Sequence, residues 1–375
     1  MKKINFGKLG FLILIYTLLL SHAVPCHASE ASVNATCDAM ETGESCEALS
    51  RDVRVSSRLW ELFFGEKKAD AGESRLVAIG GNVFGIKMNT AHPIVIDAQD
   101  NSLFHRGDAI IAIGDRETRC NKDVESILDG CSGEVLSLRV LRSGEEIKLC
   151  VKPQASGGKY RLGVSLRDSA LGIGTVTYID PTDGSFGGLG HGVTDSETGE
   201  LVEMQGGDTS GVILGGVHKG ECGKPGELVG ILTAEDVGDI CKNTDCGIFG
   251  VFSSEKYKNR KLVELADKED VHEGEARIIS TIKNGKEAEY KIELYDINYS
   301  SDGSKSFKIR VTDEALVALS GGIVRGMSGS PIIQDGKLIG AVTHVMVANP
   351  REGYGIFIEN MLNASESARN ELPAA

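Results

Sequence analysis

The sequence Gly326-Met327-Ser328-Gly329-Ser330-Pro331, followed by Ile332-Ile333-Gln334-Asp335-Gly336-Lys337-Leu338-Ile339-Gly340, decides the fold. Glycines on both sides of Ser328 let the backbone bend tightly enough to expose one hydroxyl. They also allow neighbouring backbone N–H groups to converge on a single oxygen. The apolar residues that follow, interrupted by Asp335-Gly336, predict a buried β-hairpin. This stretch therefore indicates a β structure with a candidate nucleophile at a tight turn.

The surrounding sequence, from Arg161 to about Leu362, has the same character. Short apolar runs alternate with glycines, and Asn284-Gly285 is one of several hairpin signals. One short helix is expected over residues 312–320, where Thr312 or Asp313 can cap the first turn. About 200 residues of short strands with few helical patterns predict a β-barrel or paired barrels.

Composition supports a mostly β, exported protein. Glycine accounts for 47 of the 375 residues and aromatic residues for only 5%, which favours turn-rich β structure. Removing the three lysines of residues 1–28, a segment without acids, takes the formal charge from −14 to −17. Such a negative surface repels nucleic acids and anionic membranes, so no nucleic-acid partner is expected.

The N-terminus predicts export. Lys2, Lys3 and Lys8 flank an apolar run from Leu9 to Leu20, and small residues suited to cleavage follow at Ser21-His22-Ala23 and Cys26-His27-Ala28. Residues 1–28 are therefore interpreted as a secretory signal peptide, with an uncleaved membrane anchor as the alternative. Residues 29–75 form a polar N-terminal segment, and residues 363–375 a C-terminal tail.

The cysteines allow disulfides and do not favour a metal site. Cleavage after Ala28 leaves eight cysteines, an even number in an exported chain, although sequence does not give their connectivity. Cys241 and Cys246 are close in sequence, but no second pair or histidine cluster completes a zinc site. Neither a metal nor another cofactor is expected.

Residues 76–153 resemble a bacterial PDZ domain along their whole length, with Arg106-Gly107-Asp108 as the most specific element. Such domains bind peptide termini or strands by strand addition. The segment Val83-Phe84-Gly85-Ile86 matches the loop whose N–H groups would receive a terminal carboxylate. The alternative is a small β domain that only orients its neighbour. A short linker over residues 154–160 separates this region from the β domain.

Ser328 needs a general base, because a serine hydroxyl is a weak nucleophile. Among six histidines that remain after export, His191 lies between glycines in Gly188-Leu189-Gly190-His191-Gly192, where an imidazole stays accessible. His344 is the rival base. The carboxylate that would orient the imidazole is left open among four residues: Asp168, Asp195, Asp208 and Asp313.

The serine turn resembles the nucleophile turn of chymotrypsin-like serine proteases, in which the N–H groups of Gly326 and Ser328 would form the oxyanion hole. Several motifs in order resemble the stage IV sporulation protein B peptidase family over about Leu76 to Leu362. They are residues 160–177, 188–192, 223–227, 243–250, the serine turn and 341–345.

That resemblance implies an N-terminal PDZ domain followed by a chymotrypsin-like serine endopeptidase domain over residues 161–362. It places the catalytic histidine on His191, the serine on Ser328 and the aspartate on Asp313. It also implies export to the space between the forespore and mother-cell membranes. There the protein would cleave its own chain and a membrane-bound inhibitory protein, which would trigger intramembrane activation of a late sigma factor.

Three alternatives to an active signalling protease remain: an exported quality-control serine protease, an inert PDZ peptide-binding scaffold, and a latent form awaiting processing. The strand after the serine turn adds a candidate substrate pocket at Thr343 and His344. Period-two alternation would place His344 on the same face as Val342, and Thr343 on the opposite face. His344 can reach the pocket only if the Val342 face points inward.

Overall fold

The structure is a computed structural model that describes residues 75–98, 101–195, 199–253, 257, 259–283 and 285–370. The predicted signal peptide or anchor and nearly all of the N-terminal segment lie outside these residues. Among the described residues, no helix is both long enough and apolar enough to cross a membrane. The described chain is mostly β, as predicted.

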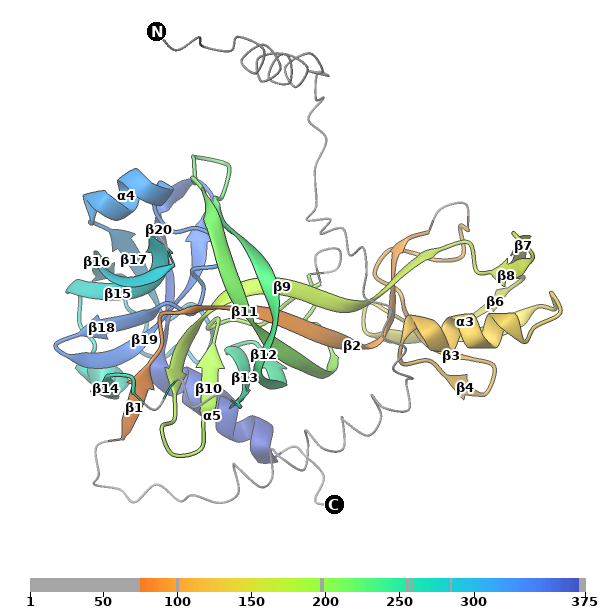
Figure 1. The fold of residues 1–375 in the computed structure, drawn as a ribbon, viewed down its shortest axis with the longest axis horizontal. Helices are drawn as coiled ribbons and strands as arrows, with labels where there is room; N and C mark the ends of the chain where they lie inside the picture. Colours follow the sequence, from red (N-terminus) through yellow and green to blue (C-terminus); the bar gives the residue numbers. More distant parts are fainter. Residues whose placement is uncertain are drawn as a thin grey trace, which may run out of the picture. The chain divides into compact units, whose positions relative to one another are not determined.

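Six strands close into a first barrel. The sheet order β9-β10-β13-β12-β11-β2 returns to β9 because β2 also pairs with β9 (Figure 1). Alternate residues of β2, Phe84, Ile86 and Met88, are buried inside the barrel, where Phe84 packs edge-on against Phe186. The strands are β2 (Val83–Asp97), β9 (Ser165–Ile179), β10 (Ser185–Gly188), β11 (Met204–His218), β12 (Glu227–Thr244) and β13 (Gly247–Phe252).

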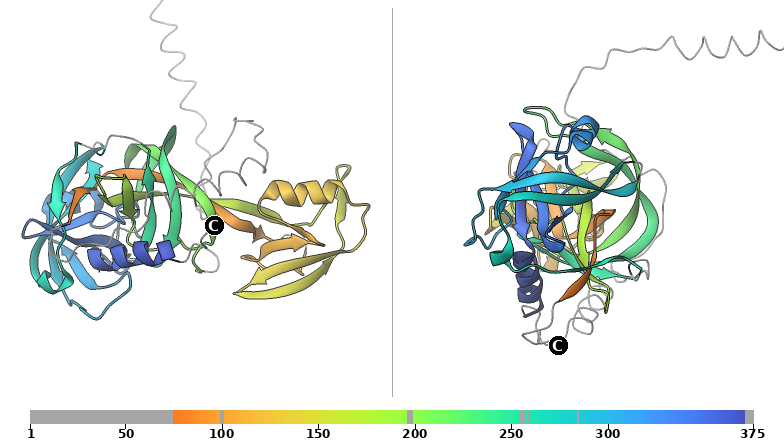
Figure 2. Two further views of the ribbon diagram at one scale, coloured as in Figure 1. Left: turned by 90° about the horizontal axis from the view of Figure 1, so that it is seen from below. Right: turned by 90° about the vertical axis from the view of Figure 1, so that its left-hand side faces the viewer.

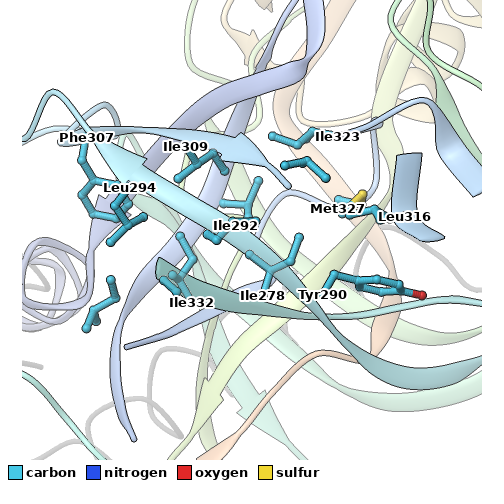
Figure 3. Close-up of a cluster of buried hydrophobic side chains, with 14 of the residues drawn as sticks. Ile278, Tyr290, Ile292, Leu294, Phe307, Ile309, Leu316, Ile323, Met327 and Ile332 are labelled. Carbon is cyan, nitrogen blue, oxygen red and sulfur yellow. The ribbon is translucent and has the colours of Figure 1, made fainter. Parts of the chain in front are cut away.

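The second barrel is closed by six strands in the order β15-β16-β17-β20-β19-β18. If the six strands of each barrel are numbered along the chain, both barrels have the same spatial order, 1-2-3-6-5-4. The interior of the second barrel is a hydrophobic cluster that includes Ile278, Ile292 and Met327 (Figure 3). The strands are β15 (Gly274–Lys283), β16 (Lys286–Tyr295), β17 (Phe307–Val311), β18 (Pro331–Gln334), β19 (Lys337–Met346) and β20 (Asn349–Phe357), with helix α4 (Glu314–Ser320) after β17.

A smaller lobe is inserted between the first two strands of the first barrel. Strands β2 and β9 run side by side out of the barrel and into this lobe (Figures 1 and 2). The inserted lobe has its own core, which includes Phe104, Ile110 and Leu138. Its elements are β3 (Ala109–Ile113), β4 (Arg116–Glu117), α3 (Asn121–Asp129), β5 (Leu136–Arg142), β6 (Glu145–Val151), β7 (Gln154–Ser156) and β8 (Lys159–Arg161).

The insertion changes the domain boundaries expected from sequence. Residues 76–153 do not form one unit that precedes the protease domain, because β1 (Leu76–Ile79) and the first half of β2 pair with strands of the first barrel. The Arg106-Gly107-Asp108 motif does lie in the lobe. Asp108 is buried there and accepts two hydrogen bonds of 2.7 Å from Arg142 of β5, which fixes the turn before β3.

Helix α5 (Ile358–Asn370) joins the two barrels. It contacts β10, β12 and β13 of the first barrel and β19 and β20 of the second. A buried cluster that includes Phe249, Ala341, Ile356 and Met361 fills the space between them. Strand β14 (Leu262–Glu264), which pairs with β1, and the short 3-10 helix η2 (Lys268–Asp270) lie on the chain between the barrels. Part of the predicted C-terminal tail is therefore helical.

Candidate active site

The serine turn is held to the second barrel by its own backbone. Gly329 N–H donates to the Val342 carbonyl at 2.7 Å, and Ser330 N–H donates to Met327. Gly329 has φ +93°, and a Cβ there would lie 1.9 Å from the Thr175 carbonyl oxygen, so only glycine fits. The Gly326 and Ser328 N–H groups donate to no acceptor within the described part of the chain. Both are available for an oxyanion.

Two buried threonines of β9 tie the turn to the first barrel. Thr175 donates from its backbone N–H to the Ser328 carbonyl at 2.9 Å and from Oγ1 to the Gly326 carbonyl at 2.8 Å. Thr177 Oγ1 donates to the Gly329 carbonyl at 2.8 Å. The Thr175 carbonyl in turn accepts from Leu189 N–H, next to the loop that carries His191. Thr175 therefore links the serine turn to the histidine loop.

His191 follows the third strand of the first barrel. Asn243 of β12 fixes the next residues, since its side-chain amide accepts from and donates to the Val193 backbone at 2.8 and 2.9 Å. The His191 Nδ1–H donates to the Gly192 carbonyl at 2.8 Å, which leaves Nε2 as the proton-accepting nitrogen. Burial lowers the pKa of His191, and the Gly192 hydrogen bond partly opposes this.

Adjacent residues of β19 contact the two candidate catalytic side chains, Ser328 and His191. Ser328 Oγ donates to the Thr343 carbonyl at 2.7 Å, and the His191 ring lies against the His344 ring with centroids 4.6 Å apart and planes tilted by 35°. Ser328 and His191 thus meet at the same short segment. In this structure the serine hydroxyl is bonded to a carbonyl and not to the imidazole, so it must turn before it can react.

A β-bulge explains the positions of Thr343 and His344. Val342 pairs with Gly355 and Val345 pairs with Gly353, so two residues of β19 face Tyr354 alone. Val342 and Val345 therefore both pack on the interior of the second barrel. The strict alternation predicted from sequence is wrong here, because the extra residue lets His344 point away from the Val342 face.

The structure gives Asp313 a different role from that implied by the family resemblance. Its carboxylate accepts from Ala315 and Leu316 N–H at 2.9 and 3.2 Å, and from Lys291 N–H at 3.2 Å. Asp313 is therefore the N-cap of α4, in line with the capping role that the sequence also allowed. Its carboxylate makes no hydrogen bond to His191.

The other candidate carboxylates are also not bonded to His191, whose hydrogen bond goes to the Gly192 carbonyl. Asp168 accepts from the Asn121 N–H at the start of α3, and Asp195 pairs with Arg167. Asp208 lies within β11, opposite Lys87 of β2. A backbone carbonyl therefore orients the imidazole in place of a carboxylate.

The predicted carboxylate-binding segment Val83–Ile86 is not a loop. It lies in β2 with β9 on one side and β11 on the other, with Gly85 paired to Ile173 and to Ser210. Gly85 and Ile86 therefore have a partner strand on each side and no free edge for a peptide terminus, and the assignment of this segment as a carboxylate-binding loop is wrong. No local pattern in residues 76–97 indicates that the first barrel begins inside the PDZ-like stretch.

The inserted lobe does contain a cavity, at a different place. A space of about 300 Å³ lies between α3 and the segment 159–166. Its lining combines apolar side chains, among them Val124, Leu128 and Leu166, with charged ones such as Glu125 and Arg161. Leu162-Gly163-Val164 forms one end of the cavity, directly before β9 begins.

Among the residues that the structure describes, no cysteines are grouped with other possible ligands in a metal-binding arrangement. Cys120 is disulfide-bonded, whereas Cys131, Cys150, Cys222, Cys241 and Cys246 are free thiols. Burial raises the pKa of Cys241 to about 12, with the charge of Asp239 adding to the effect. The Cys241 thiol is therefore protonated at neutral pH, whereas metal binding requires a thiolate.

Sequence reasoning missed the residues that support the site. Thr175, Thr177 and Asn243 contact the segments that carry Ser328 and His191, and each lies at least 50 residues along the chain from the segment that it holds. The only available signal was that all three fall within motifs shared with the resembled family. Their roles depend on barrel closure, which sequence does not display.

Each barrel has the same strand order, with a histidine after the third strand of the first and a serine before the fourth strand of the second. This is the architecture of chymotrypsin-like serine proteases, and the chain is a serine endopeptidase. The family model described as SpoIVB peptidase S55 matches residues 158–362, more than half of the chain. The chain therefore belongs to the SpoIVB peptidase family, and an inert scaffold is not its role.

Solved structures with a similar fold are distant. The active form of the Rv3671c protease of M. tuberculosis is 12% identical, with a TM-score of 0.31 over 55% of this chain and 78% of that one. Its inactive form is also 12% identical, with a TM-score of 0.30 over 52% and 84% of the two chains. The HtrA-type protease AlgW with a decapeptide is 10% identical, with a TM-score of 0.34 over 78% and 65%. A search of curated proteins finds no match.

Proposed function

We propose that this endopeptidase is an exported signalling protease of sporulation, which cleaves its own chain and a membrane-bound inhibitory protein between the forespore and mother-cell membranes. The observation that carries the proposal is the SpoIVB peptidase match, which includes both His191 and Ser328. Cleavage of the inhibitor would release intramembrane proteolysis and so activate a late mother-cell sigma factor. The predicted signal or anchor at residues 1–28 is consistent with that location.

The geometry supports a serine-protease mechanism. The Ser328 hydroxyl turns from the Thr343 carbonyl and passes its proton to His191 Nε2 as Oγ attacks the scissile carbonyl. The oxyanion that forms accepts from the Gly326 and Ser328 N–H groups. The imidazolium then protonates the leaving amine, and water hydrolyses the acyl-enzyme by the reverse transfers. The Gly192 carbonyl keeps Nδ1 protonated throughout.

Ser328→Ala tests this proposal, and Ser330→Ala is the matched control. Both replace a serine of the same turn, but the buried Ser330 Oγ has no hydrogen-bond partner, so its removal should leave proteolysis intact. Each purified full-length chain is incubated without other proteases, together with the membrane-bound inhibitory protein proposed as its substrate. Mass spectrometry then shows whether either protein has been cleaved. Self-processing by Ser328→Ala would overturn the assignment of the nucleophile. If wild type cleaves its own chain normally but does not cleave the inhibitory protein, only the signalling role is overturned.

We also propose that the inserted lobe binds peptide termini or strands, in the cavity between α3 and residues 159–166. Beside this cavity, β9 pairs with β2 on one side, with Leu166 opposite Val95. Its other side faces α3, so an extended peptide can add to the sheet there. The same strand continues to Thr175, and it therefore connects the cavity with the serine turn.

Leu166→Arg tests the lobe, with Leu171→Arg as control on the same strand. Leu166 lines the cavity, whereas Leu171 is 58% exposed outside it. Leu166→Arg should weaken cleavage of the membrane-bound target more than cleavage of a short peptide, and Leu171→Arg should change neither. Equal loss on both substrates would show that the lobe is structural or acts directly on the catalytic site.

A further inference from the structure

The bulge on β19 places His344 beside the reacting serine. Thr343, which accepts the Ser328 hydrogen bond, is its immediate neighbour, and the His344 ring lies against His191. A group bound at His344 is therefore within one residue of the catalytic centre. In this fold the strand after the serine turn runs beside the substrate, so such a group belongs to the substrate chain.

His344 carries an unsatisfied polar atom at this position. Its Nδ1 is buried and has no hydrogen-bond partner among the described residues. A buried polar atom without a partner costs free energy, and an external ligand that supplies the partner recovers it. Burial, followed by the charges of His191 and Lys305, lowers the pKa of His344 to about 4. The neutral ring can therefore donate one hydrogen bond to an incoming acceptor.

Lys305 supplies a positive charge at the same place. Its exposed ammonium lies 5.2 Å from the centroid of the Tyr354 ring, and Tyr354 faces the bulge from β20. The loop that carries it is tied to the site, because Thr343 Oγ1 donates to the Ser304 carbonyl at 2.8 Å. Lys305 forms no ion pair with any residue that the structure describes, although the whole chain has a net charge of −14.

We propose that His344, Lys305 and Tyr354 form a subsite that binds an acidic side chain of the substrate, N-terminal to the scissile bond. This inference rests on the proposed function, in which Ser328 and His191 carry out peptide cleavage, and it specifies the substrate class. A carboxylate can accept from the His344 ring and lie near the Lys305 ammonium at once. An amide side chain gains only the hydrogen bond, and a basic one is repelled by Lys305.

The test uses the full-length chain and peptides based on one sequence that wild type cleaves. Glu, Gln and Lys are placed in turn at each of the three positions before the cut, and kcat/KM is measured. We expect Glu to exceed Gln by about tenfold at one of these positions, with Lys lowest. The Glu preference should fall as salt is raised, because salt screens the charge of an exposed lysine.

Substitutions then distinguish the effect of the Lys305 charge from a purely structural role of this residue. Lys305→Gln should lower kcat/KM for the Glu peptide about tenfold relative to that for the Gln peptide, and Lys305→Arg should restore the preference for Glu. Lys337→Gln makes the same charge change at the start of β19, away from the proposed subsite, where Lys337 pairs with Asp270, and should have no effect. An equal Glu preference in wild type and Lys305→Gln, or no preference in wild type, would overturn the subsite. Failure of wild type to cleave any peptide or its own chain would instead overturn the proposed function.

Discussion

Thr175→Val removes a single hydroxyl from the centre of the catalytic machinery. Thr175 is fully buried, and its Oγ1 donates to the Gly326 carbonyl at 2.8 Å. Valine has nearly the same shape, so the change leaves that carbonyl buried without its donor, which costs about 2 kcal/mol. For a domain of this size, a loss of this magnitude lowers the melting temperature by roughly 4–8 °C.

The same substitution should also slow catalysis. The Gly326 carbonyl and the N–H groups of the proposed oxyanion hole belong to one tight turn, so releasing the carbonyl loosens the alignment of the donors. Loss of a whole donor costs about 100- to 1,000-fold in kcat. We therefore expect the smaller loss of about tenfold for Thr175→Val, with KM little changed, because the substrate-binding strand is untouched.

Thr177→Val is the matched control for this prediction. Thr177 is equally buried and donates over the same distance to the Gly329 carbonyl, but Gly329 is also held by its own N–H bond to Val342. Thermal unfolding and kcat on a short peptide are measured for both variants and for Thr175→Ser, which keeps the hydroxyl. The reasoning is refuted if both valine variants lower kcat equally, or if Thr175→Val is destabilised with an unchanged kcat.

Two further predictions follow from the site. Asp313→Asn should retain kcat/KM on a short peptide within about threefold of wild type, because Asn can accept the same N-cap hydrogen bonds. A loss as large as that of His191→Ala on the same peptide would show that Asp313 is catalytic. The acid limb of kcat/KM should have its midpoint below pH 6.5, the ordinary histidine value, because burial lowers the pKa of His191 and the base must be neutral. Activity is thus retained below pH 6.5 and lost as the pH falls through the lowered pKa; a midpoint above 6.5 would contradict the buried, carbonyl-bonded imidazole.

Much of the architecture could be predicted from local sequence patterns. Turn signals such as Asp335-Gly336 do join two paired strands, with Asp335 at φ +50° and Gly336 at φ +84°. The short helix expected at residues 312–320 forms as α4, because Asp313 caps it. These features depend on residues near one another in the chain, where propensity and turn chemistry act directly.

Pairing between distant strands could not be predicted in the same way. The apolar pattern of Val83–Ile86 fits a strand in either a PDZ-like domain or a barrel, and only its partners, β9 and β11, decide between them. These partners lie about 90 and 125 residues away, beyond the inserted lobe, so periodicity carries no information about them. The PDZ-like pattern extends over the strand that enters the lobe, although the first half of that strand pairs within the barrel.

The bulge at Thr343 and His344 shows the same limit within a single strand. Period-two alternation follows from a regular ladder, and one extra residue reverses the face of every side chain beyond it. Nothing in the sequence Val342-Thr343-His344-Val345 marks the irregularity, because each residue suits a strand. The bulge arises where β19 must pair with β20 and also receive the serine turn, since the Val342 carbonyl and N–H are both bonded to that turn. Thr343 and His344, beside Ser328 and His191, are therefore hard to predict because two structural demands meet at them.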